Sequence, residues 1–403
     1  FGRLEAMTAR ADDGVLRLDP DVSACPEWET GLGVGFENLT TSLETLIRGI
    51  GRLRETIRLD ERWRESLEEQ LLELESVAGR TAGALDALRL AFSTADDATP
   101  MVRWIERRGG GGGREPNVVV NAAPIDVSGA LREALFERVD TAVLTSATLA
   151  TRDGFDFLRS RLGLDGGGIK VAEAVYPSPF DYEEQTIVAI PTDLPGPRDE
   201  DNGRFDVATA DIVRDLAEMS DGGIFVLFTS YRSLRRVAEE LRRRGVDGRW
   251  PLFEQGEAPR ARLVEAFAAS GHGILLGVAS FWEGVDVPGR PLRGLVITKL
   301  PFKVPSEPLT AARVEAIERN GGNAFYEYML PHAALRLKQG FGRLIRSRSD
   351  RGAILLLDRR IVEKGYGRYF LDSLPPAPVR VGRWAEIASA VRGFYALEAS
   401  GVR

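Results

Sequence analysis

Six short apolar runs constrain the fold of this chain more than any other feature of its sequence. Most of them are separated by amphipathic stretches that are long enough for helices of ten or more residues. Continuous apolar strands that alternate with such helices predict an α/β fold, in which helices cover both faces of a parallel sheet. The runs lie at residues 143–144, 187–190, 224–228, 274–278, 295–298 and 354–357.

The segments that directly follow these runs are the candidate functional segments. In open parallel sheets, ligands bind outside the carboxyl ends of the strands. Polar, basic or glycine-rich stretches come directly after several of the runs. They lie at residues 145–149, 228–231, 280–289 and 299–305.

Residues 38–92 have a helical pattern with almost no strand signal. Two apolar stripes recur there at helical spacing, as on helices that bury one face. They predict a helical hairpin that bends near residues 59–61, with the stripes buried mainly against each other rather than against a partner. The first stripe is Leu39, Leu43, Leu46, Ile50, Leu53 and Ile57, and the second is Leu67, Leu71, Leu74, Ala78, Thr81, Leu85, Leu88 and Phe92.

Consecutive glycines at residues 109–113 are typical of a linker between domains. The flanking stretches 102–105 and 118–120, however, both have the pattern of short strands. We therefore interpret the glycines as the tip of a surface hairpin.

The composition indicates a globular protein. With 403 residues and 43% hydrophobic content, the chain can bury the cores of roughly two or three domains. It has neither a long apolar run nor a secretion signal, so we expect no membrane span and predict a cytoplasmic location. Cys25 is the single cysteine, and His272 and His332 are the two histidines. We therefore expect no disulfide framework, no iron–sulfur cluster and no metal site within these residues. The first residue is Phe1 rather than Met, which predicts a further upstream part of the polypeptide.

The charge is unevenly distributed along the chain. The net charge is −7, but residues 331–370 hold ten lysines and arginines against three carboxylates. Polyanions respond to such local fields rather than to the total charge. A second basic group follows residue 231, and we interpret it mainly as a solubilising helix face. It consists of Arg232, Arg235, Arg236, Arg242, Arg243, Arg244 and Arg249.

The region 331–370 contains a glutamine, two glycines and two arginines in close order: Gln339, Gly340, Gly342, Arg343 and Arg346. Residues three apart on a helix share a face, so both arginines are predicted to point at one target. Guanidinium groups match phosphate oxygens, and glycines let a backbone approach closely. From these residues alone, a solvated basic helix end is an equally good interpretation.

Hydroxyl side chains follow the predicted strand at residues 142–144. Ser146, Ala147 and Thr148 come there in a row. Such hydroxyls either relay a hydrogen bond between a phosphate site and a neighbouring domain or simply form a cap or turn. The local sequence does not favour one interpretation over the other.

Thr229, Ser230 and Tyr231 follow the run at residues 224–228 and precede an arginine-rich helix. The hydroxyls either cap that helix and nothing more, or cap it so that its amides face a nucleic-acid phosphate. Residues 299–305 form a stiff, basic turn, which we interpret mainly as positioning the helix that follows.

The segment 280–289 combines aromatics, carboxylates and glycines in one loop. Glu283 and Asp286 are suited to hold a ribose hydroxyl or to orient an arginine, and Gly284 lies between them. An exposed aromatic stacks on a base for about 1–3 kcal/mol. For Trp282 we favour core packing over stacking.

Taken in order, these segments resemble the later motifs of superfamily 2 helicases of the DinG/XPD type. No single motif is decisive, but the ordered set over residues 118–373 is highly specific. Residues 1–105 match only by position and helical character. The motifs are Thr-Ser-Ala-Thr-Leu from residue 145, Leu-Phe-Thr-Ser-Tyr from 227, Ser-Phe-Trp-Glu-Gly-Val-Asp-Val-Pro-Gly from 280, Lys-Leu-Pro-Phe from 299 and Gln-Gly-Phe-Gly-Arg-Leu-Ile-Arg from 339.

The resemblance implies a RecA-like parallel-sheet motor domain preceded by a mostly helical arch domain. The arch would occupy residues 1–105, or form its latter portion there. Residues 106–150 would return into the first motor domain and end in motif III, and residues 151–403 would form the second motor domain.

The resemblance also assigns roles to residues. In motif VI, Gln339 would contact the phosphates and Arg343 and Arg346 would act as arginine fingers. The other assignments are nucleotide proximity for Glu283, Gly284, Asp286 and Gly342, DNA contacts for Thr229, Ser230, Tyr231, Ser280 and Trp282, and motif III coupling for Ser146, Ala147 and Thr148.

The implied activity is ATP-dependent unwinding of DNA with 5′-to-3′ travel. The implied partners are single-stranded DNA, forked or overhanging duplexes and the missing N-terminal motor half, with a monomeric enzyme and a role in DNA repair. ATP and Mg²⁺ would be the cofactors. The chain has neither a Gly-x-x-x-x-Gly-Lys-Ser/Thr loop nor an Asp-Glu-Ala-His box, so by itself it is expected not to hydrolyse ATP, and the Mg²⁺ ligands are expected upstream.

Two alternatives stay open at this point. One is a non-catalytic module that binds nucleic acid or another partner and lacks the ATPase half. The other is a helicase whose upstream part carries an exonuclease domain. Any iron–sulfur cysteines would also lie upstream, so Cys25 decides nothing about a cluster.

Overall fold

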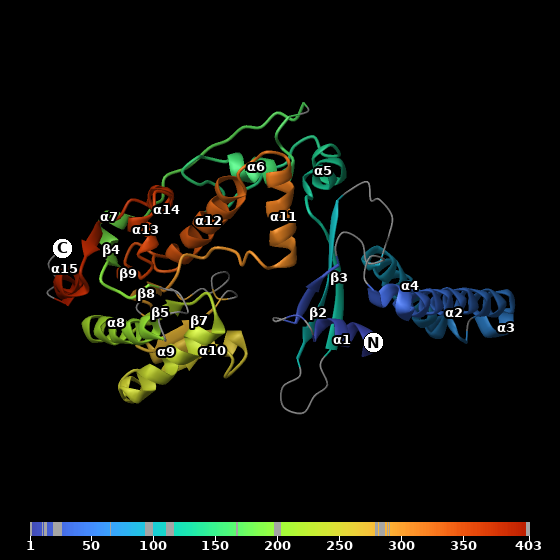
Figure 1. Cartoon of the computed structure of the whole chain (residues 1–403), viewed down its shortest axis with the longest axis horizontal. Coiled ribbons are helices and arrows are strands. Elements are labelled where there is room, and N and C mark those ends of the chain that lie inside the picture. The colour runs from blue at the N-terminus through green and yellow to red at the C-terminus, as the bar shows by residue number, and fades with distance from the viewer. Residues whose placement is uncertain are drawn as a thin grey trace. The chain divides into compact units, whose positions relative to one another are not determined.

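The computed structural model describes residues 2–9, 11, 14–18, 26–64, 66–92, 100–109, 117–166, 168–196, 203–278, 281, 287, 289 and 291–399. The chain forms two compact units (Figure 1). One comprises Phe1–Gly129 and Val304–Gly322, and the other comprises Ala130–Lys303 and Asn323–Arg403.

The second unit is built on a seven-stranded sheet in the order β10-β4-β9-β8-β5-β7-β6, in which every neighbouring pair is parallel. Five of the six apolar runs form its five inner strands, which confirms the predicted parallel sheet. The two edge strands, β6 and β10, are less apolar and were not predicted. The strands are β4 (Thr186–Pro191), β5 (Ile224–Leu227), β6 (Leu252–Glu254), β7 (Ile274–Gly277), β8 (Gly294–Ile297), β9 (Gly352–Leu356) and β10 (Val379–Gly382).

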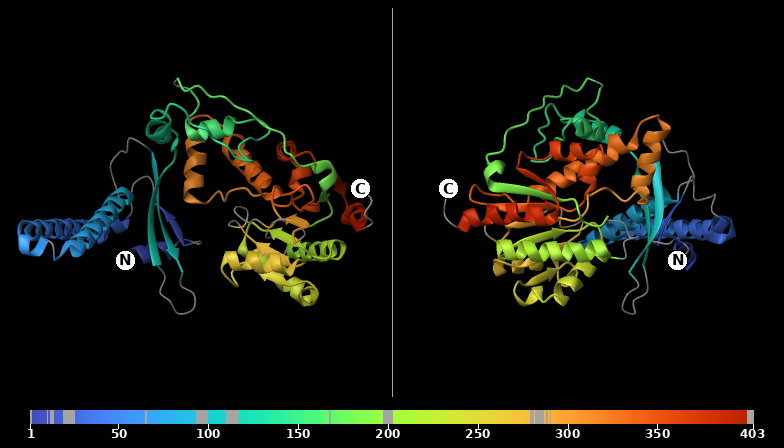
Figure 2. Two further views of the ribbon diagram at one scale, coloured as in Figure 1. Left: turned by 180° about the vertical axis from the view of Figure 1, so that it is seen from behind. Right: turned by 60° about the vertical axis from the view of Figure 1, so that its left-hand side comes forward.

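Helices cover both faces of this sheet (Figure 2). They are α7 (Tyr182–Gln185), α8 (Arg204–Ser220), α9 (Tyr231–Arg243), α10 (Arg260–Ser270), α12 (Leu330–Phe341), α13 (Arg360–Glu363), α14 (Gly367–Ser373) and α15 (Trp384–Ala399). Helix α6 (Asp156–Leu162) belongs to the same unit. Three short turns of other helix types belong to the same unit: η3 (Arg132–Phe136), η5 (Val246–Gly248) and η7 (Phe325–Met329).

Successive strand residues point to opposite faces, so the sheet separates two cores. In β5, Ile224 and Val226 join the core with α8, α9 and α15. Phe225 and Leu227 join the core with α10, α12, α13 and α14. These strands are buried on both faces, which explains why their sequences are continuously apolar rather than alternating.

The strand predicted at residues 142–144 is wrong. Residues 141–146 have no regular structure, and the Val143 side chain is 83% exposed. Within the part of the chain that the structure describes, no segment pairs with this stretch. A strand pairs its backbone groups only with a neighbouring strand, so an apolar run without a neighbour does not become one.

The first unit contains a three-stranded antiparallel sheet in the order β1-β2-β3. Residues 102–105 and 118–120 lie on paired strands, which confirms the predicted hairpin, although residues 110–116 at its tip lie outside the described residues. The elements are α1 (Gly2–Thr8), β1 (Val15–Arg17), η2 (Trp28–Leu32), α2 (Gly33–Leu59), α3 (Glu61–Arg64), α4 (Glu68–Ala91), β2 (Met101–Arg108), β3 (Asn117–Pro124) and α11 (Pro308–Arg319), while α5 (Ser128–Leu131) crosses from this unit into the other.

Helices α2 and α4 form the predicted helical hairpin, with the bend directly after Leu59. Arg54 pairs with Glu75 at 2.6 Å, and Arg89 pairs with Glu44, as expected for antiparallel helices. The predicted mutual burial of the apolar stripes is only half right. Leu43, Ile50 and Ile57 are half-buried, whereas Leu39, Leu46 and Leu53 are exposed, because a pair of helices covers only one narrow seam on each.

Helix α11 follows β8 in sequence but belongs to the first unit. The Arg313 Nε donates to the Ile125 carbonyl oxygen at 2.8 Å, and Arg17 binds the Glu315 carboxylate at 2.6 Å and 2.7 Å. The hydrogen bonds from Arg17 hold the pKa of Glu315 below its usual value. Helix α11, which lies between β8 and α12 in the sequence, thus belongs to the unit with the antiparallel sheet.

Candidate functional site

Helix α12 carries the glutamine of the candidate phosphate motif. Gln339 lies in its last turn, and its Nε2 donates to Thr148 Oγ1 at 3.4 Å. The neighbouring Lys338 donates from Nζ to the Ala150 carbonyl oxygen at 3.0 Å. Burial lowers the pKa of Lys338. The structure therefore brings Gln339 and the predicted coupling residue Thr148 together, although no strand places Thr148 there.

The hydroxyls of the predicted motif III form a tight turn of their own. The Thr148 amide donates to Ser146 Oγ at 3.3 Å, and the two hydroxyl oxygens lie 3.5 Å apart. Ala147 lies between them in the turn. Of the two interpretations of this segment, the turn is present, and Thr148 in addition accepts a hydrogen bond from Gln339.

Arg343 and Arg346 do not share a helix face, which corrects the prediction made from their spacing. Helix α12 ends at Phe341, and the next two turn amides, of Arg343 and Leu344, bond to carbonyls only three residues back at 3.1 Å and 3.3 Å. Leu344 and Ile345 are adjacent and both buried. Because the helix has ended before both arginines, helical spacing no longer determines where their side chains point.

The loop after α12 is held by a buried carboxylate that the sequence did not reveal. Asp350 is 6% exposed, and its Oδ2 accepts from the amides of Arg346 and Ser347, each at 2.8 Å. Its Oδ1 accepts from the Ser347 hydroxyl at 2.7 Å. Gln185 Nε2 donates to the carbonyl oxygens of Ser347 and Asp350 at 2.9 Å and 2.7 Å. The backbone that carries Arg346 is therefore fixed from within the domain, while the Arg346 residue is exposed.

Gly342 ends helix α12 in an ordinary helical conformation, with φ −65°. A Cβ at this position would lie 3.5 Å from the Lys338 carbonyl oxygen and 3.8 Å from that of Gln339, which are normal contact distances. The chain itself therefore leaves room for an alanine here. Its own backbone does not demand a glycine at position 342.

A second buried carboxylate, Asp358, lies two residues after the end of β9. It is 2% exposed, and its Oδ2 accepts from the Leu300 amide at 2.9 Å and from Arg360 Nη2 at 2.6 Å. Its hydrogen bonds raise the pKa of Arg360, whose guanidinium lies 5.7 Å from the Phe302 ring centroid. Asp358 thus fixes the basic turn that begins at residue 299, while the positioning role of that turn stays a prediction. The strand-end rule would have found Asp358, since it is the first residue after the predicted strand at 354–357.

Ser230 caps helix α9, as one interpretation of its segment predicted. Its hydroxyl accepts from the Ser233 amide at 3.3 Å. Thr229 and Tyr231 are exposed beside it, Tyr231 at 46%. The Tyr231 hydroxyl accepts from Gln255 Nε2 at 2.6 Å, and Gln255 Oε1 accepts from the Val278 amide at 2.7 Å. The tyrosine ring is thereby tied to the carboxyl end of β7.

Most arginines of helix α9 and its following turn are bound to carboxylates. Arg242 pairs with Glu254 at 2.9 Å and Glu257 at 2.8 Å, and Arg243 pairs with Glu240 at 2.7 Å. Hydrogen bonds from Arg243 and Arg244 lower the pKa of Glu240. These contacts fit the predicted solubilising face. Further examples are Arg236 with Asp206 at 3.6 Å, Arg244 with Asp211 at 3.1 Å, and Arg249 over the Trp250 ring at 4.4 Å.

The loop at residues 280–289 is described only in part. Ser280, Trp282, Glu283, Gly284 and Asp286 lie outside the described residues, so their predicted roles stay predictions. Phe281 and Val287 are buried, and the Phe281 ring centroid lies 6.2 Å from that of Phe225 on β5.

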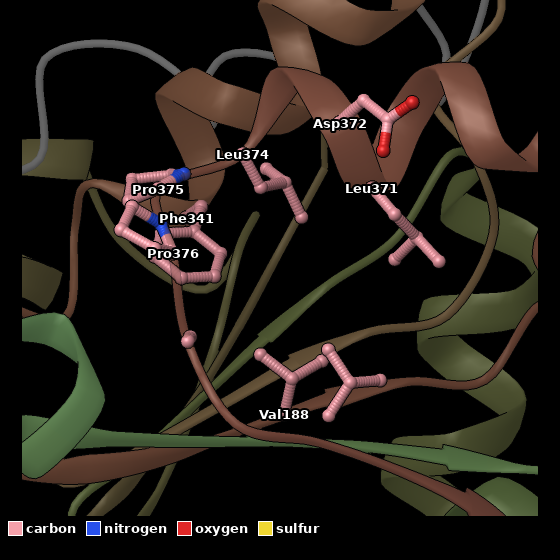
Figure 3. A pocket seen from close by; sticks show the side chains of 9 residues that line it. Val188, Phe341, Leu371, Asp372, Leu374, Pro375 and Pro376 are labelled. Carbon is pink, nitrogen blue, oxygen red and sulfur yellow. The ribbon is translucent and has the colours of Figure 1, made fainter.

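A cavity of about 290 Å³ lies at the end of α12 (Figure 3). Phe341 lines it beside Leu374, Pro375 and Pro376, and Val188 of β4 contributes from the sheet. Its lining is apolar except for Asp372, so it has no donor side chain for a phosphate. This cavity is therefore not the candidate phosphate site. That site is assigned to Gln339 in the last turn of α12 and to Arg343 and Arg346 after it.

Two further properties limit the chemistry of the described residues. They include no group of three or more histidine, cysteine or carboxylate side chains placed to hold a metal ion. None of the helices in the described ranges is both long enough and apolar enough to cross a membrane.

Comparison with known families defines the class of this protein. Residues 213–377 match the family described as the helicase C-terminal domain. The match includes β5, β7, β8, β9 and helix α12. It also includes the loop after α12, residues 342–350, which carries Arg343 and Arg346 and is here named the arginine loop. The parallel-sheet unit thus contains a helicase C-terminal domain and has a RecA-like fold.

The chain carries the helicase C-terminal domain and matches part of the C-terminal region of the DinG and YoaA helicases. It is 38% identical over 277 residues to the ATP-dependent DNA helicase YoaA of Escherichia coli, a match that covers 69% of this chain and 41% of that protein. It is 37% identical over 307 residues to the 3′-5′ exonuclease DinG of Bacillus subtilis, covering 76% of this chain and 32% of that protein. The ATP-dependent DNA helicase DinG of Photobacterium profundum is 37% identical over 287 residues, covering 70% of this chain and 40% of that protein. The chain therefore spans less than half the length of these relatives.

Solved structures show the same fold. A structure described as an XPD helicase aligns with a TM-score of 0.52 at 16% identity, over 80% of this chain and 56% of that one. A structure described as apo XPD aligns with a TM-score of 0.51 at 16% identity, over 80% and 60%. At this identity the likeness concerns the fold alone.

Proposed function

We propose that the full-length protein containing this chain is an ATP-dependent DNA helicase. The observation that carries the proposal is the contact between Gln339 on α12 and Thr148, next to a loop whose backbone Asp350 fixes around Arg346. The names of the YoaA and DinG relatives support the same activity. Residues 1–105 would form the helical arch, residues 106–150 the return into the first motor domain, and residues 151–403 the second motor domain.

In the proposed mechanism, Gln339, Arg343 and Arg346 face the phosphates of ATP. The amide of Gln339 and the two guanidinium groups are donors, which fits an anionic ligand. Arg346 would stabilise the charge that develops on the transferred phosphoryl group, a role worth about 10³–10⁵ in rate. Glu283, Gly284, Asp286 and Gly342 would lie close to the nucleotide. The phosphate loop and the Mg²⁺ ligands would come from the upstream half.

The proposed DNA contacts lie at the carboxyl ends of β5 and β7. Thr229, Ser230 and Tyr231 follow β5, and Ser280 and Trp282 belong to the loop after β7. The exposed Tyr231 ring and the N-terminal amides of α9 suit a base and a phosphate of single-stranded DNA. The 5′-to-3′ direction, a monomeric state and a role in DNA repair are further parts of this proposal.

One substitution tests the ATP part of the proposal. Arg346→Ala in the full-length protein should lower DNA-stimulated ATP hydrolysis by about 10³-fold or more, while binding of single-stranded DNA stays within about twofold of the wild type. Hydrolysis is measured by phosphate release at saturating ATP and DNA, and binding by fluorescence anisotropy. Normal turnover in this variant would refute the assignment of Arg346.

A strand-displacement assay tests the helicase part. The full-length protein should separate a duplex with a 5′ single-stranded overhang when ATP is present, and should leave a blunt duplex intact. DNA binding without ATP-dependent displacement on any overhang would favour the alternative of a non-catalytic binding module. The exonuclease named for the Bacillus subtilis relative is a property of that protein, and a nuclease assay on the full-length chain would show whether it applies here.

A further inference from the structure

Residues 148–152, here named the latch segment, are held by side chains from two helices of the motor domain. From α12, Lys338 Nζ donates to the Ala150 carbonyl oxygen at 3.0 Å. The next residue, Gln339, donates from Nε2 to Thr148 Oγ1 at 3.4 Å. Tyr369 and Ser373 of α14 hold the other end of the segment. The latch segment has neither helix nor inter-strand pairing beyond one isolated bridge from Thr151 to Gly154. Its position therefore depends on side-chain contacts.

Helix α14 binds the end of the latch segment. The Tyr369 hydroxyl donates to Thr151 Oγ1 at 3.1 Å, and the Arg152 amide donates to Ser373 Oγ at 3.0 Å. The Arg152 guanidinium lies 4.7 Å from the Tyr369 ring centroid. Ser373 Oγ in turn donates to the Tyr369 carbonyl oxygen at 2.7 Å, which fixes its lone pairs toward the Arg152 amide. The contacts join residues about two hundred positions apart in sequence, so they are tertiary and not local.

Lys338 is placed in a partly buried position. The side chain is half-buried, and burial lowers the pKa of its ammonium group. Removing an ammonium group from water is unfavourable unless it finds strong acceptors. Lys338 Nζ reaches the Ala150 carbonyl oxygen from the helix turn that also carries Gln339, four residues before Gly342 and five before Arg343. A shift of the latch segment therefore acts on the helix end from which the arginine loop starts.

We propose that Lys338, Tyr369 and Ser373 are positioning residues that hold the latch segment against α12. Through this contact, a displacement of the residues before the latch segment reaches Gln339 and the arginine loop. The proposal rests on the proposed helicase function, in which it couples ATP turnover to strand displacement.

The direct test compares ATP turnover with strand displacement in the same full-length variant. Lys338→Met keeps the length of the side chain and removes its donor, whereas Lys338→Arg keeps a donor. In Lys338→Met, the number of base pairs displaced per ATP hydrolysed should fall by about tenfold, the size expected when one hydrogen bond from a charged group is lost. Lys338→Arg should recover most of that ratio. An unchanged ratio in Lys338→Met, or equal losses of both activities, would overturn the proposal.

A double-mutant cycle tests the α14 end of the contact. Tyr369→Phe and Thr151→Val each remove one side of the same hydrogen bond, so the double variant should lower the ratio no more than either single variant. Tyr366→Phe, one turn earlier at the N-cap of α14, is the matched control and should leave the ratio unchanged. Additive effects of the two substitutions would contradict a shared contact.

Limited proteolysis tests the contacts of the latch segment independently of helicase activity. In the full-length protein, brief trypsin treatment should cleave after Arg152 at least several times faster in Lys338→Met and Tyr369→Phe than in the wild type or Tyr366→Phe. If the wild-type full-length protein shows no ATP-dependent displacement, the proposed function fails. If it is active but neither the ratio nor the cleavage rate responds, the latch fails.

Discussion

Arginines are about equally frequent in helix α9 and in the loop after helix α12. The two regions differ in which groups the nearby carboxylates bind. Three carboxylates bind the guanidinium groups of Arg242 and Arg243 of α9: Glu240 of the same helix, Glu254 of β6 and Glu257 after β6. After α12, Asp350 accepts from the backbone amides of Arg346 and Ser347 and from a hydroxyl. In the first region the carboxylates neutralise the cations, whereas in the second a carboxylate fixes the chain that carries the cation.

This difference shows why a count of basic residues does not locate a phosphate site. A guanidinium group bound to a carboxylate gives up donors that a phosphate needs, and releasing them costs the ion pair. A loop whose backbone is fixed presents its side chain at small entropic cost. We therefore expect substitutions in the α12 loop to change ATP turnover, and substitutions in the paired part of α9 to change little.

The largest effect of this comparison is expected for Asp350→Ala. It leaves two amides and a hydroxyl without their acceptor, so unfolding free energy should fall by about 2–3 kcal/mol, the range for hydrogen bonds to a charged group. ATP turnover of the full-length protein should fall by about 10²-fold, because displacement of a reacting group by about 1 Å has that effect.

Denaturant unfolding and phosphate release measure the two quantities for Asp350→Ala. Asp372→Ala is the matched control, since Asp372 lies on the surface of α14 and contacts Arg368 only at 3.5 Å. Its effect on stability should stay below about 1 kcal/mol. An unchanged ATP turnover in Asp350→Ala would show that the position of Arg346 does not matter.

A smaller effect is expected for Gly342→Ala. The chain has room for the methyl group at φ −65°, so unfolding free energy should stay equal or rise by about 0.4–1 kcal/mol. ATP turnover should nevertheless fall by about tenfold if a phosphate approaches this backbone, because the methyl group displaces it. Gly365→Ala, at a position with no atom within 4 Å of the added Cβ, is the control. Full activity of Gly342→Ala would place the phosphate elsewhere.

Arg232 and Arg235 test the exposed start of α9. Among the described residues, neither side chain has an ion-pair partner, in contrast to the arginines later on the helix. If both touch phosphates, the double change to Gln should reduce the slope of log K against log salt by about 0.7 per lost contact on single-stranded DNA. Fluorescence anisotropy at several salt concentrations gives the slope. An unchanged slope would remove both residues from the DNA path.

The smallest effect is expected for Arg243→Gln. Its guanidinium group is bound to Glu240 on the same helix, and exposed pairs of this kind contribute less than about 1 kcal/mol. Affinity for single-stranded DNA and its salt slope should therefore match the wild type within about twofold. A loss as large as that of the Arg232 and Arg235 variant would mean that the ion pair opens to bind DNA, and the comparison would fail.

The sequence predicted the inner strands of the sheet because they are buried on both faces and thus continuously apolar. It missed β6 and β10, whose edge positions leave their residues partly exposed. It also predicted a strand at residues 142–144, where the apolar pattern is present but no neighbouring strand is. An apolar run forms a strand only when a neighbouring strand is present to pair with its backbone amides and carbonyls.

For the site, the order of motifs along the chain predicts a phosphate role for Gln339, Arg343 and Arg346, and that role stays a prediction. The helical spacing gave the wrong local geometry for the two arginines, because it does not show that α12 ends at Phe341. Lys338, Gln185 and Asp350 were missed. Gln185 binds a backbone 165 residues away, and no local pattern encodes such a contact.

The central claim is that Arg346 uses its guanidinium fork on phosphate, whereas Arg243 uses its fork on a carboxylate. The most direct test is ATP turnover at saturating ATP and DNA in full-length Arg346→Lys beside Arg243→Lys. Lysine keeps the charge but loses the planar fork, so Arg346→Lys should be slower by at least about tenfold, while Arg243→Lys should stay within about twofold of the wild type. Equal turnover in the two variants would contradict the claim.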